Sequence, residues 1–333
     1  MRVGTNGEIE REALRLHEKL GKLGWSMDTC RISASLTLEI NRLKREKNAI
    51  ILAHSYQSPD IIFGVADFTG DSYGLSKEAM GAKAGIIVFS GVRFMAETAK
   101  ILNPEKRVFI PSTEAGCSLA DGITAEDVRS LKKEHPGCPV VCYVNTSAEV
   151  KAESEICCTS ANAEKVVSSL PQSEIIFVPD SFMAKNVAKR TGKKLIPWSA
   201  RCVVHADIDP LKIGRIRGLF GGASVLAHSE CPPEIAAISD MVGGTTDMEK
   251  YVSGKGSGPY FLLTECGLAD RLRAKFPEKE FVGSCSLCPY MKKNSLQSIL
   301  RVLKALPSEN EIKVDPQVSK KARLSLEAML KIA

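Results

Sequence analysis

IILAHSYQ, at residues 50–57, is the stretch that decides the fold, because the chain repeats it twice in altered form. The second copy is VVCYVNTS at residues 140–147, and the third is SVLAHSEC at residues 224–231. Each copy is an apolar, β-branched run that leads into a histidine or a tyrosine. Self-similarity at a regular spacing indicates that one supersecondary unit is built several times. The sequence therefore predicts three similar α/β units.

The spacing of later residues supports the repeat. A hydroxyl residue follows the strand-end residue at nearly the same interval in three pairs: His54 and Ser72, 18 positions apart; Tyr143 and Ser160, 17; and His228 and Thr245, 17. Each copy then ends in a cysteine: Cys117, Cys202 and Cys288. The three units are thus expected to deliver one thiol each from an equivalent place.

Continuous apolar runs alternate with helical patterns in each copy. The predicted strands are AIILAH, GIIVFS and RVFIP in the first copy, PVVCYV, EIIFVP and KLIPW in the second, and ASVLAH, PYFLLT and EFVG in the third. This alternation is typical of parallel sheets covered on both faces. The predicted fold class is α/β, with three pseudo-symmetric α/β units whose short parallel sheets pack around a central cluster site. The predicted divisions are a helical extension at 1–47, units at 48–125, 126–208 and 209–298, and closing helices at 299–333.

The three repeated cysteines suggest a metal centre. Packing does not require the same residue in three copies, although a lone cysteine is usually a small apolar side chain. Three well-separated thiolates suit a [4Fe–4S] cluster with one open iron that acts as a Lewis acid. Zinc is the alternative, because Cys285-x-x-Cys288 is half of a zinc site. A reversible Cys285–Cys288 disulfide would compete with cluster assembly.

Composition narrows the class of protein. The chain has 333 residues, 44% hydrophobic and 25% charged, and its net charge of +6 is spread along the sequence. Scattered basic residues favour a solvated surface over a nucleic-acid interface, and no apolar run is long enough to cross a membrane. The N-terminus is charged rather than signal-like, so a cytoplasmic location is expected. Eleven cysteines there point to metal or redox chemistry rather than a disulfide framework.

Polar residues end the predicted strands, where ligands bind in open parallel sheets. His54, Tyr56, Tyr143, His228 and Glu230 form a set suited to acid–base catalysis, and His205 follows its cysteine in CVVH. The hydroxyl residues Ser72, Ser160 and Thr245 precede helical patterns, so we expect them to cap helices. Helix N-termini with hydroxyls also bind carboxylate or phosphate. The two roles are compatible.

These stretches resemble the quinolinate synthases. The resemblance extends from about Ile50 to Ile332 and rests on AHSYQSPDI, AGCSLAD, CYVNTSAEVKA, CVVH, AHSECPPEI and CSLCPYMKKNSL, among others. It implies three pseudo-symmetric α/β domains around a central [4Fe–4S] cluster. It also implies condensation of iminoaspartate with dihydroxyacetone phosphate to quinolinate, phosphate and water in NAD biosynthesis, with possible functional coupling to an aspartate-oxidising enzyme.

The resemblance implies roles for individual residues. Cys117, Cys202 and Cys288 would be the cluster ligands. Catalytic residues would be His54, Tyr56, His205, His228 and Glu230. Substrate contacts would come from His54, Ser72, Tyr143, Asn145, Ser160, His228, Glu230 and Thr245. Gly244 departs from the family's pattern, because it stands where a serine is common.

Two other functions remain open on the sequence. Another hydro-lyase with an open cluster would use the same cysteines for simple dehydration. A non-enzymatic zinc- or redox-binding protein would be built on Cys285-x-x-Cys288. Product analysis separates the first from a quinolinate synthase, and iron and sulfide content separates the second.

Overall fold

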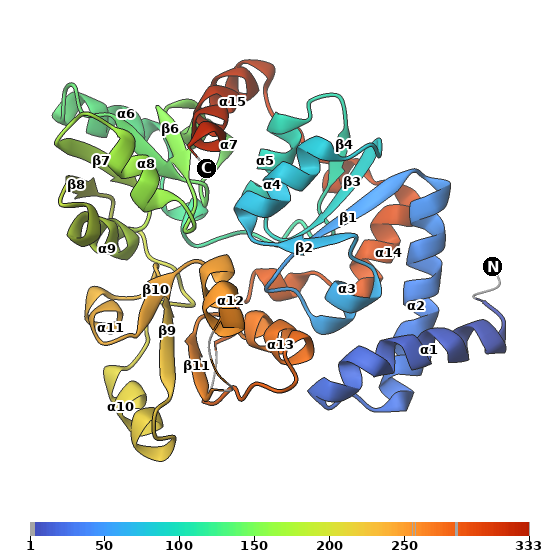
Figure 1. Ribbon diagram of the computed structural model, residues 1–333. Helices are drawn as coiled ribbons and strands as arrows, with labels where there is room; N and C mark the ends of the chain where they lie inside the picture. Colours follow the sequence, from blue (N-terminus) through green and yellow to red (C-terminus); the bar gives the residue numbers. More distant parts are fainter. Residues whose placement is uncertain (1–3, 255, 257, 284–285, 333) are drawn as a thin grey trace. The chain divides into compact units, whose positions relative to one another are not determined.

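The computed structural model describes residues 4–254, 256, 258–283 and 286–332 (Figure 1). The chain forms two compact units. Unit 1 comprises Met1–Ala115, Glu265–Glu280 and Leu287–Ile312, and unit 2 comprises Gly116–Thr264, Phe281–Ser286 and Lys313–Ala333. The predicted α/β class is confirmed, and each sheet is parallel. Within the described ranges, no helix is both long and apolar enough to cross a membrane.

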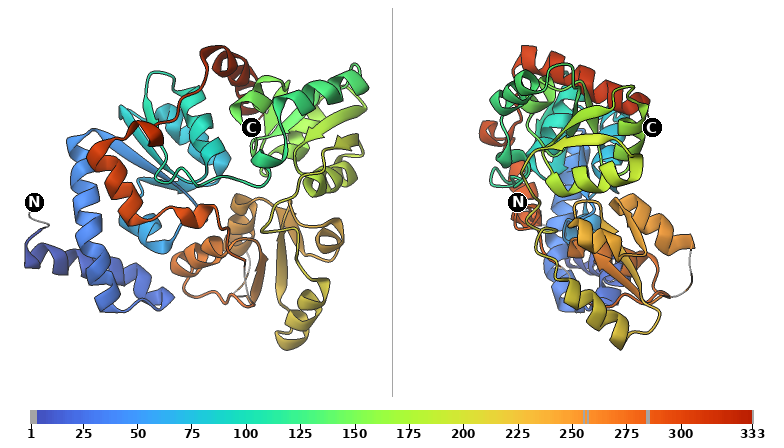
Figure 2. Two further views of the ribbon diagram at one scale, coloured as in Figure 1. Left: turned by 180° about the vertical axis from the view of Figure 1, so that it is seen from behind. Right: turned by 90° about the vertical axis from the view of Figure 1, so that its left-hand side faces the viewer.

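Unit 1 is built on one four-stranded sheet of order β2-β1-β3-β4. Its strands are β1 (Ala49–His54), β2 (Phe68–Gly70), β3 (Ile86–Ser90) and β4 (Arg107–Phe109). Its α-helices are α1 (Asn6–Leu20), α2 (Met27–Glu46), α3 (Pro59–Gly64), α4 (Ser72–Gly81), α5 (Arg93–Leu102), α13 (Cys266–Lys275) and α14 (Leu296–Ala305). Short 3₁₀ turns are η1 (Gly21–Leu23), η3 (Met291–Lys293) and η4 (Ser308–Asn310). Helices α2 and α14 lie side by side, as the view from behind shows (Figure 2).

The N-terminal extension is part of unit 1. Helix α1 is capped by Thr5, and its apolar face buries Leu16 and Leu20 against Cys30 of α2. Helix α2 then packs on the sheet, where Ile40 joins the core. The burial of an apolar stripe on each helix explains why these otherwise polar segments are helical.

Unit 2 contains two sheets, of order β6-β5-β7-β8 and β10-β9-β11. The strands are β5 (Val140–Tyr143), β6 (Ile156–Cys158), β7 (Glu174–Val178), β8 (Lys194–Pro197), β9 (Ser224–His228), β10 (Met241–Gly243) and β11 (Tyr260–Leu263). The helices are η2 (Ala120–Gly122), α6 (Ala125–Glu134), α7 (Ala148–Ala152), α8 (Ala163–Ser169), α9 (Ser181–Thr191), α10 (Pro210–Leu219), α11 (Pro233–Ala237), α12 (Thr245–Gly254) and α15 (Pro316–Lys331). In every sheet the first strand along the chain pairs with the second and the third.

The C-terminal helix α15 covers β6 and α7. Leu326 and Met329 are fully buried, and the hydroxyl of Ser325 donates to the carbonyl oxygen of Lys151 at 2.9 Å. Lys151 is itself 0% exposed. The last helix therefore completes the core of the β5–β8 sheet.

A repeated hydrogen bond supports the three-fold repeat. In each sheet, an acidic side chain that follows the first helix accepts a backbone N–H from the first strand. The pairs are Ile51 with Asp67, at 2.7 Å; Val140 with Glu155, at 2.6 Å; and Val225 with Asp240, at 2.7 Å. Each strand residue lies three positions before His54, Tyr143 or His228. The equivalent strands are thus anchored at equivalent points. The five predicted divisions of the chain remain a prediction.

Some local predictions were wrong. The three-residue strands β2, β6 and β10 were missed, and the predicted strand EFVG at residues 280–283 is only an isolated bridge between Phe281 and Tyr260. Asp71, not Ser72, caps α4, because its carboxylate accepts the N–H of Gly74. Asn162 occupies the N-cap of α8, where Ser160 was expected to act. Ser72 is instead the first residue of its helix.

Candidate functional site

The strand ends carry the predicted site residues, and two of them share a turn. In unit 1 the backbone N–H of Tyr56 donates to Nδ1 of His54 at 3.2 Å. In unit 2 the backbone N–H of Glu230 donates to Nδ1 of His228 at 3.3 Å. This His-Ser-x turn fixes the orientation of each imidazole ring, because Nδ1 accepts a backbone N–H from two residues further on. The repeated His-Ser-x motif therefore forms the same hydrogen-bonded turn in both units.

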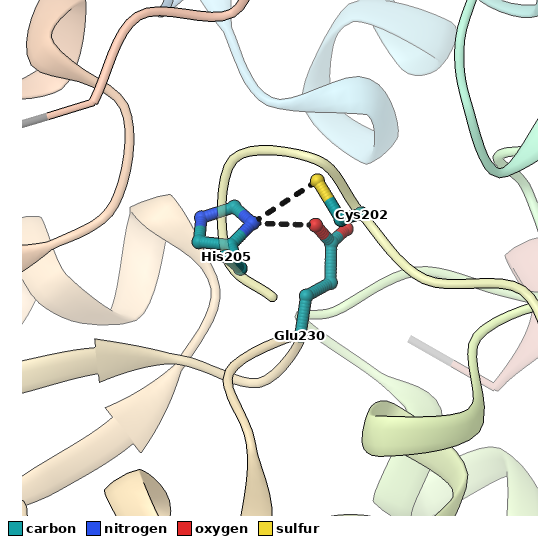
Figure 3. A group of neighbouring side chains, drawn as sticks. All are labelled: Cys202, His205 and Glu230. Carbon is teal, nitrogen blue, oxygen red and sulfur yellow. Dashed lines mark hydrogen bonds and ion pairs between the residues drawn. The ribbon is translucent and has the colours of Figure 1, made fainter. Parts of the chain in front are cut away.

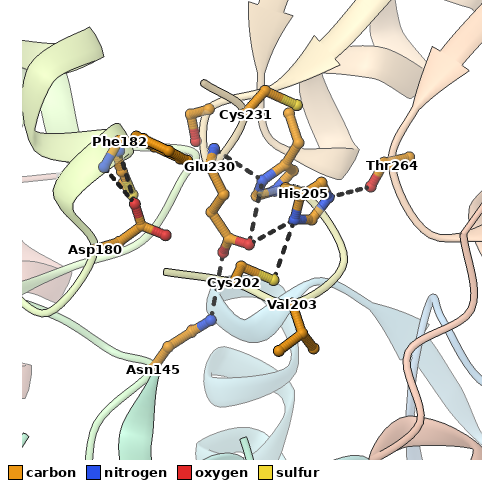
Figure 4. Close-up of polar contacts among 12 residues, drawn as sticks. Asn145, Asp180, Phe182, Cys202, Val203, His205, Glu230, Cys231 and Thr264 are labelled. Carbon is orange, nitrogen blue, oxygen red and sulfur yellow. Dashed lines mark hydrogen bonds and ion pairs between the residues drawn. The ribbon is translucent and has the colours of Figure 1, made fainter. Parts of the chain in front are cut away.

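Glu230 is the centre of the site in unit 2 (Figure 4). Its Oε1 accepts the hydroxyl of Tyr143 at 2.5 Å and the side-chain amide of Asn145 at 3.4 Å. Its Oε2 lies 2.8 Å from Nδ1 of His205. Glu230 is 3% exposed, so these partners supply the hydrogen bonds that water would otherwise make. The loop after β5 and the loop after β8 are thereby joined at one carboxylate.

His205 connects this carboxylate to a thiol. Its Nδ1 lies 3.3 Å from Sγ of Cys202, and its Nε2 lies 3.1 Å from the hydroxyl of Thr264. The ring stacks on that of His228, with centroids 4.6 Å apart. Figure 3 shows Cys202, His205 and Glu230 turned toward one another, and their donor atoms all lie within 4.8 Å. Sulfur, imidazole nitrogen and carboxylate oxygen are all metal ligands.

Burial and neighbouring charges shift the pKa values of this group in opposite directions. Burial raises the pKa of the Cys202 thiol well above its usual value, and the negative charges of Glu230 and Cys117 raise it further. Burial also opposes ionisation of Glu230, but the attraction of the His228 and His205 rings and the hydrogen bond from Tyr143 hold its pKa below the usual range. A bound metal ion removes the penalty on the thiolate, because metal-bound thiols are deprotonated.

Cys117 lies on a loop that is tied to the loop of Cys202. The hydroxyl of Ser118 donates to the carbonyl oxygen of Arg201 at 3.2 Å and accepts the backbone N–H of Val203 at 3.3 Å. These bonds flank Cys202 on both sides. Two of the three predicted cluster ligands thus come from neighbouring loops of unit 2.

The free cysteines fall into two groups according to how deeply they are buried. Cys117, Cys202 and Cys288 are half-buried thiols, and so is Cys138. The buried thiols are Cys30, Cys142, Cys157, Cys158 and Cys231. Cys266, the first residue of α13, is disulfide-bonded, which the sequence did not lead us to expect. Cys285 lies outside the described residues. Half-burial suits a ligand that must be reached by a cofactor.

The hydroxyl residues divide between the units. In unit 2, Thr245 is buried as the first residue of α12, and Ser160 lies near Gly244. A β-carbon at Gly244 would be 2.7 Å from the hydroxyl oxygen of Ser160 and 3.3 Å from its β-carbon. The absence of a side chain at 244 therefore makes room for Ser160.

The other candidates lie in unit 1. The rings of His54 and Tyr56 meet edge to face at the end of β1, with centroids 4.5 Å apart, and both are buried. Ser72 begins α4, and Cys288 lies in the loop that leads into η3, two residues before its N-cap Tyr290. The structure therefore gathers Tyr143, Asn145, Cys202, His205, His228 and Glu230 in unit 2, and His54 with Tyr56 in unit 1.

Two residues of the unit 2 site escaped the sequence prediction. Thr264 orients His205 from the end of β11, although no repeated motif pointed to it. Asp180 is buried beside the site, where its Oδ1 caps α9 through Phe182 and Met183. The sequence did contain a signal for Asp180. This residue ends the motif FVPD, and Glu265 ends the equivalent motif LLTE of the third repeat.

The fold and the site together define an α/β protein with a buried thiol–imidazole–carboxylate group at its strand ends. Comparisons with known proteins agree. The family model described as Quinolinate synthetase A protein matches residues 38–331. The quinolinate synthase of Caulobacter vibrioides is 47% identical over 97% of this chain and 88% of its own length. Those of Xylella fastidiosa and Agrobacterium fabrum are 48% and 49% identical over 88% of this chain and 86% and 84% of theirs.

The chain belongs to the quinolinate synthase family, and it is an enzyme of this kind. The predicted resemblance is confirmed. Residues before 38 lie outside the family model, but the match to the Caulobacter vibrioides enzyme covers 97% of the chain and so includes most of the extension. The segment that forms α1 and α2 is therefore largely included in that match.

Proposed function

We propose that this chain condenses iminoaspartate with dihydroxyacetone phosphate, giving quinolinate, phosphate and water on a route to NAD. Family membership supports the product. The observation that carries the proposal further is the buried group around Glu230, where an acceptor, imidazoles and a phenol meet a thiol at one point. Condensation needs proton removal beside a carbonyl and expulsion of water, so groups that donate and accept protons must lie together.

The cofactor we propose is a [4Fe–4S] cluster with Cys117, Cys202 and Cys288 as ligands. The half-burial of these thiols and the raised pKa of Cys202 support a cationic group at this place. When bound, such a cluster supplies an open iron that polarises substrate oxygen or nitrogen as a Lewis acid. Ser118 hydrogen-bonds to the residues on both sides of Cys202, which supports Cys117 and Cys202 as members of one ligand set.

The chain's own residues divide the remaining work. Glu230 is our candidate base, because its carboxylate stays ionised among His205, His228 and Tyr143. His205 is held by Thr264 and stays turned toward Glu230. Tyr56 is our candidate proton shuttle, fixed by the turn with His54.

Binding of the anionic substrates falls to polar groups at helix starts and strand ends. Ser72 and Thr245 are the first residues of α4 and α12, and helix N-termini attract carboxylate and phosphate. Asn145 and Ser160 add neutral hydrogen bonds. Because iminoaspartate is formed by oxidising aspartate, an aspartate-oxidising enzyme is the proposed source of that substrate.

Anaerobic purification followed by iron, sulfide and zinc analysis tests the cofactor. We expect iron and sulfide in equal amounts and a broad visible absorbance. Zinc without sulfide would reject the cluster. Incubation of the iron-loaded protein with iminoaspartate and dihydroxyacetone phosphate should then yield quinolinate, and dehydration of simple hydroxy acids without ring formation would point to a hydro-lyase.

A further inference from the structure

Glu265 is a buried carboxylate that contacts segments far away in the sequence. It is 0% exposed and caps α13, where Oε2 accepts the backbone N–H of Gly267 at 2.6 Å. Its other oxygen, Oε1, accepts the backbone N–H of Cys288 at 3.3 Å and lies 2.9 Å from Nζ of Lys292. Both carboxylate oxygens are therefore engaged, as burial of a charge requires.

Lys292 continues these contacts to the end of β1. Its Nζ donates to the carbonyl oxygen of Tyr56 at 2.6 Å. Gly267 packs against the same backbone, because a β-carbon at position 267 would lie 2.8 Å from both Cα and the carbonyl carbon of Tyr56. One ion pair thus connects Tyr56, the start of α13 and Cys288, all within unit 1.

Helix capping alone does not explain this arrangement. Asp180 occupies the equivalent place in the second repeat, and one of its oxygens caps α9. Its other oxygen, Oδ2, is buried and has no hydrogen-bond partner in the described part of the chain. The cap therefore needs one carboxylate oxygen. In Glu265 the second oxygen is used for Cys288 and Lys292.

We propose that Glu265 and Lys292 are positioning residues: their ion pair holds the backbone of Tyr56 and of Cys288 in the arrangement that the reaction requires. The inference rests on the proposed function, because it takes Tyr56 as a proton shuttle and Cys288 as a cluster ligand. Neither Glu265 nor Lys292 exchanges a proton with substrate. Removing Lys292 leaves the buried charge of Glu265 without its cation, and removing the charge of Glu265 frees the Lys292 ammonium from Cys288. In either variant the two backbone segments lose their common support.

The neighbouring lysine provides a matched control. Lys293 pairs with Glu114 at 2.7 Å, but both side chains are largely exposed. Such a surface pair contributes little. The test compares Lys292→Met, Glu265→Gln and the charge-retaining Lys292→Arg with Lys293→Met. Circular dichroism of each protein first establishes that it is folded.

The first readout needs neither cluster nor activity. Hydrogen exchange by mass spectrometry on metal-free protein measures the protection of the peptide that contains Cys288. We expect exchange about 10-fold faster in Lys292→Met and Glu265→Gln than in Lys293→Met, because the amide of Cys288 loses a fixed acceptor. Equal exchange in all four variants would overturn the inference.

The second readout separates positioning from binding. In iron-loaded enzyme, a misplaced Tyr56 and Cys288 should lower kcat by about 10–100-fold with little change in KM. Iron loss to a chelator should also be faster in Lys292→Met, and Lys292→Arg should recover most of both losses. Values within about two-fold of Lys293→Met would reject the inference. If Lys292→Met does not fold, Glu265→Gln decides by the same criteria. A wild-type protein that binds no iron would instead reject the proposed function.

Discussion

Gly244 and Ser160 approach each other so closely that a β-carbon at position 244 would lie 2.7 Å from the hydroxyl oxygen of Ser160. The family's common serine at this position would therefore collide with Ser160. Position 244 lacks a hydroxyl group, but the hydroxyl group of Ser160 lies close to it. The glycine at position 244 therefore leaves space for the Ser160 side chain.

Gly244→Ala should weaken substrate binding, because Ser160 must turn its hydroxyl away to admit the new methyl group. Loss of one hydrogen bond corresponds to a KM increase of about 2–10-fold. Ser160→Ala should give a similar increase. In the double variant the second change should add little, since both act on one hydroxyl. Additive effects in steady-state kinetics would show that Gly244 acts elsewhere.

Replacing any one of Cys117, Cys202 and Cys288 with alanine should abolish the cluster, because two thiolates hold it poorly. Cys138→Ala is the matched control, since Cys138 is also half-buried. Iron and sulfide per chain after anaerobic reconstitution are the measurement. Normal iron content in any of the first three variants would remove that residue from the ligand set.

Tyr56→Phe should lower turnover by ~10²–10⁴-fold, as expected for a lost acid or base. The cluster should remain, because the contact from Lys292 is to the carbonyl oxygen of Tyr56 and not to its hydroxyl. Quinolinate formation and iron content are measured on the same preparation. Near-normal product formation with a full cluster would mean that Tyr56 has only a structural role.

Lys151→Met should change the pH dependence of stability. Burial disfavours the Cys142 thiolate, but the hydrogen bond from Cys157 and the charge of Lys151 outweigh it and lower the pKa of Cys142 to about 7. A pKa below that of the unfolded chain means that the stabilisation is present at higher pH and is lost as the pH falls through about 7.

The measurement is the free energy of unfolding of metal-free protein at about pH 6 and about pH 9, with a reducing agent present. The rise toward pH 9 should be smaller in Lys151→Met than in Lys194→Met, whose lysine pairs with Glu174 on the surface. Lys151→Met should also cost about 1–3 kcal/mol, since the carbonyl oxygen of Thr146 loses its donor. An identical rise in the two variants would contradict the assigned pair.

Much of the fold could be predicted from sequence, because the long strands of each repeat are apolar and β-branched. AIILAH coincides with β1, whereas FTG, the whole of β2, is too short to show a period. A predicted cap failed for a related reason. Asp71 and Ser72 are both good capping residues, and only the backbone at the start of α4 selects between them.

Candidate site residues that belong to the repeated strand-end motifs could be predicted from the sequence, and residues outside these motifs were missed. The strand-end motifs drew attention to Tyr143, His228 and Glu230, which the structure brings together. Lys292 lies in no repeated motif, and Thr264 stands in LLTE where FVPD has a proline, so the repeat gives it no polar counterpart. The contacts of both residues depend on how distant loops pack. Residues that position others leave a weak signal in a single sequence, because their role is defined by neighbours.

The C-terminal helix has a consequence for how the polypeptide is made. Helix α15 covers β6 and α7, yet it is synthesised roughly 160 residues after β6. At a synthesis rate of ~5–20 residues per second, the apolar face of β6 and α7 and the side chain of Lys151 stay uncovered for about 8–30 s. Until the last helix leaves the ribosome, this sheet is an incomplete layer that chaperones and proteases can recognise, and a chain that stops short of Pro316 leaves β6 and α7 uncovered.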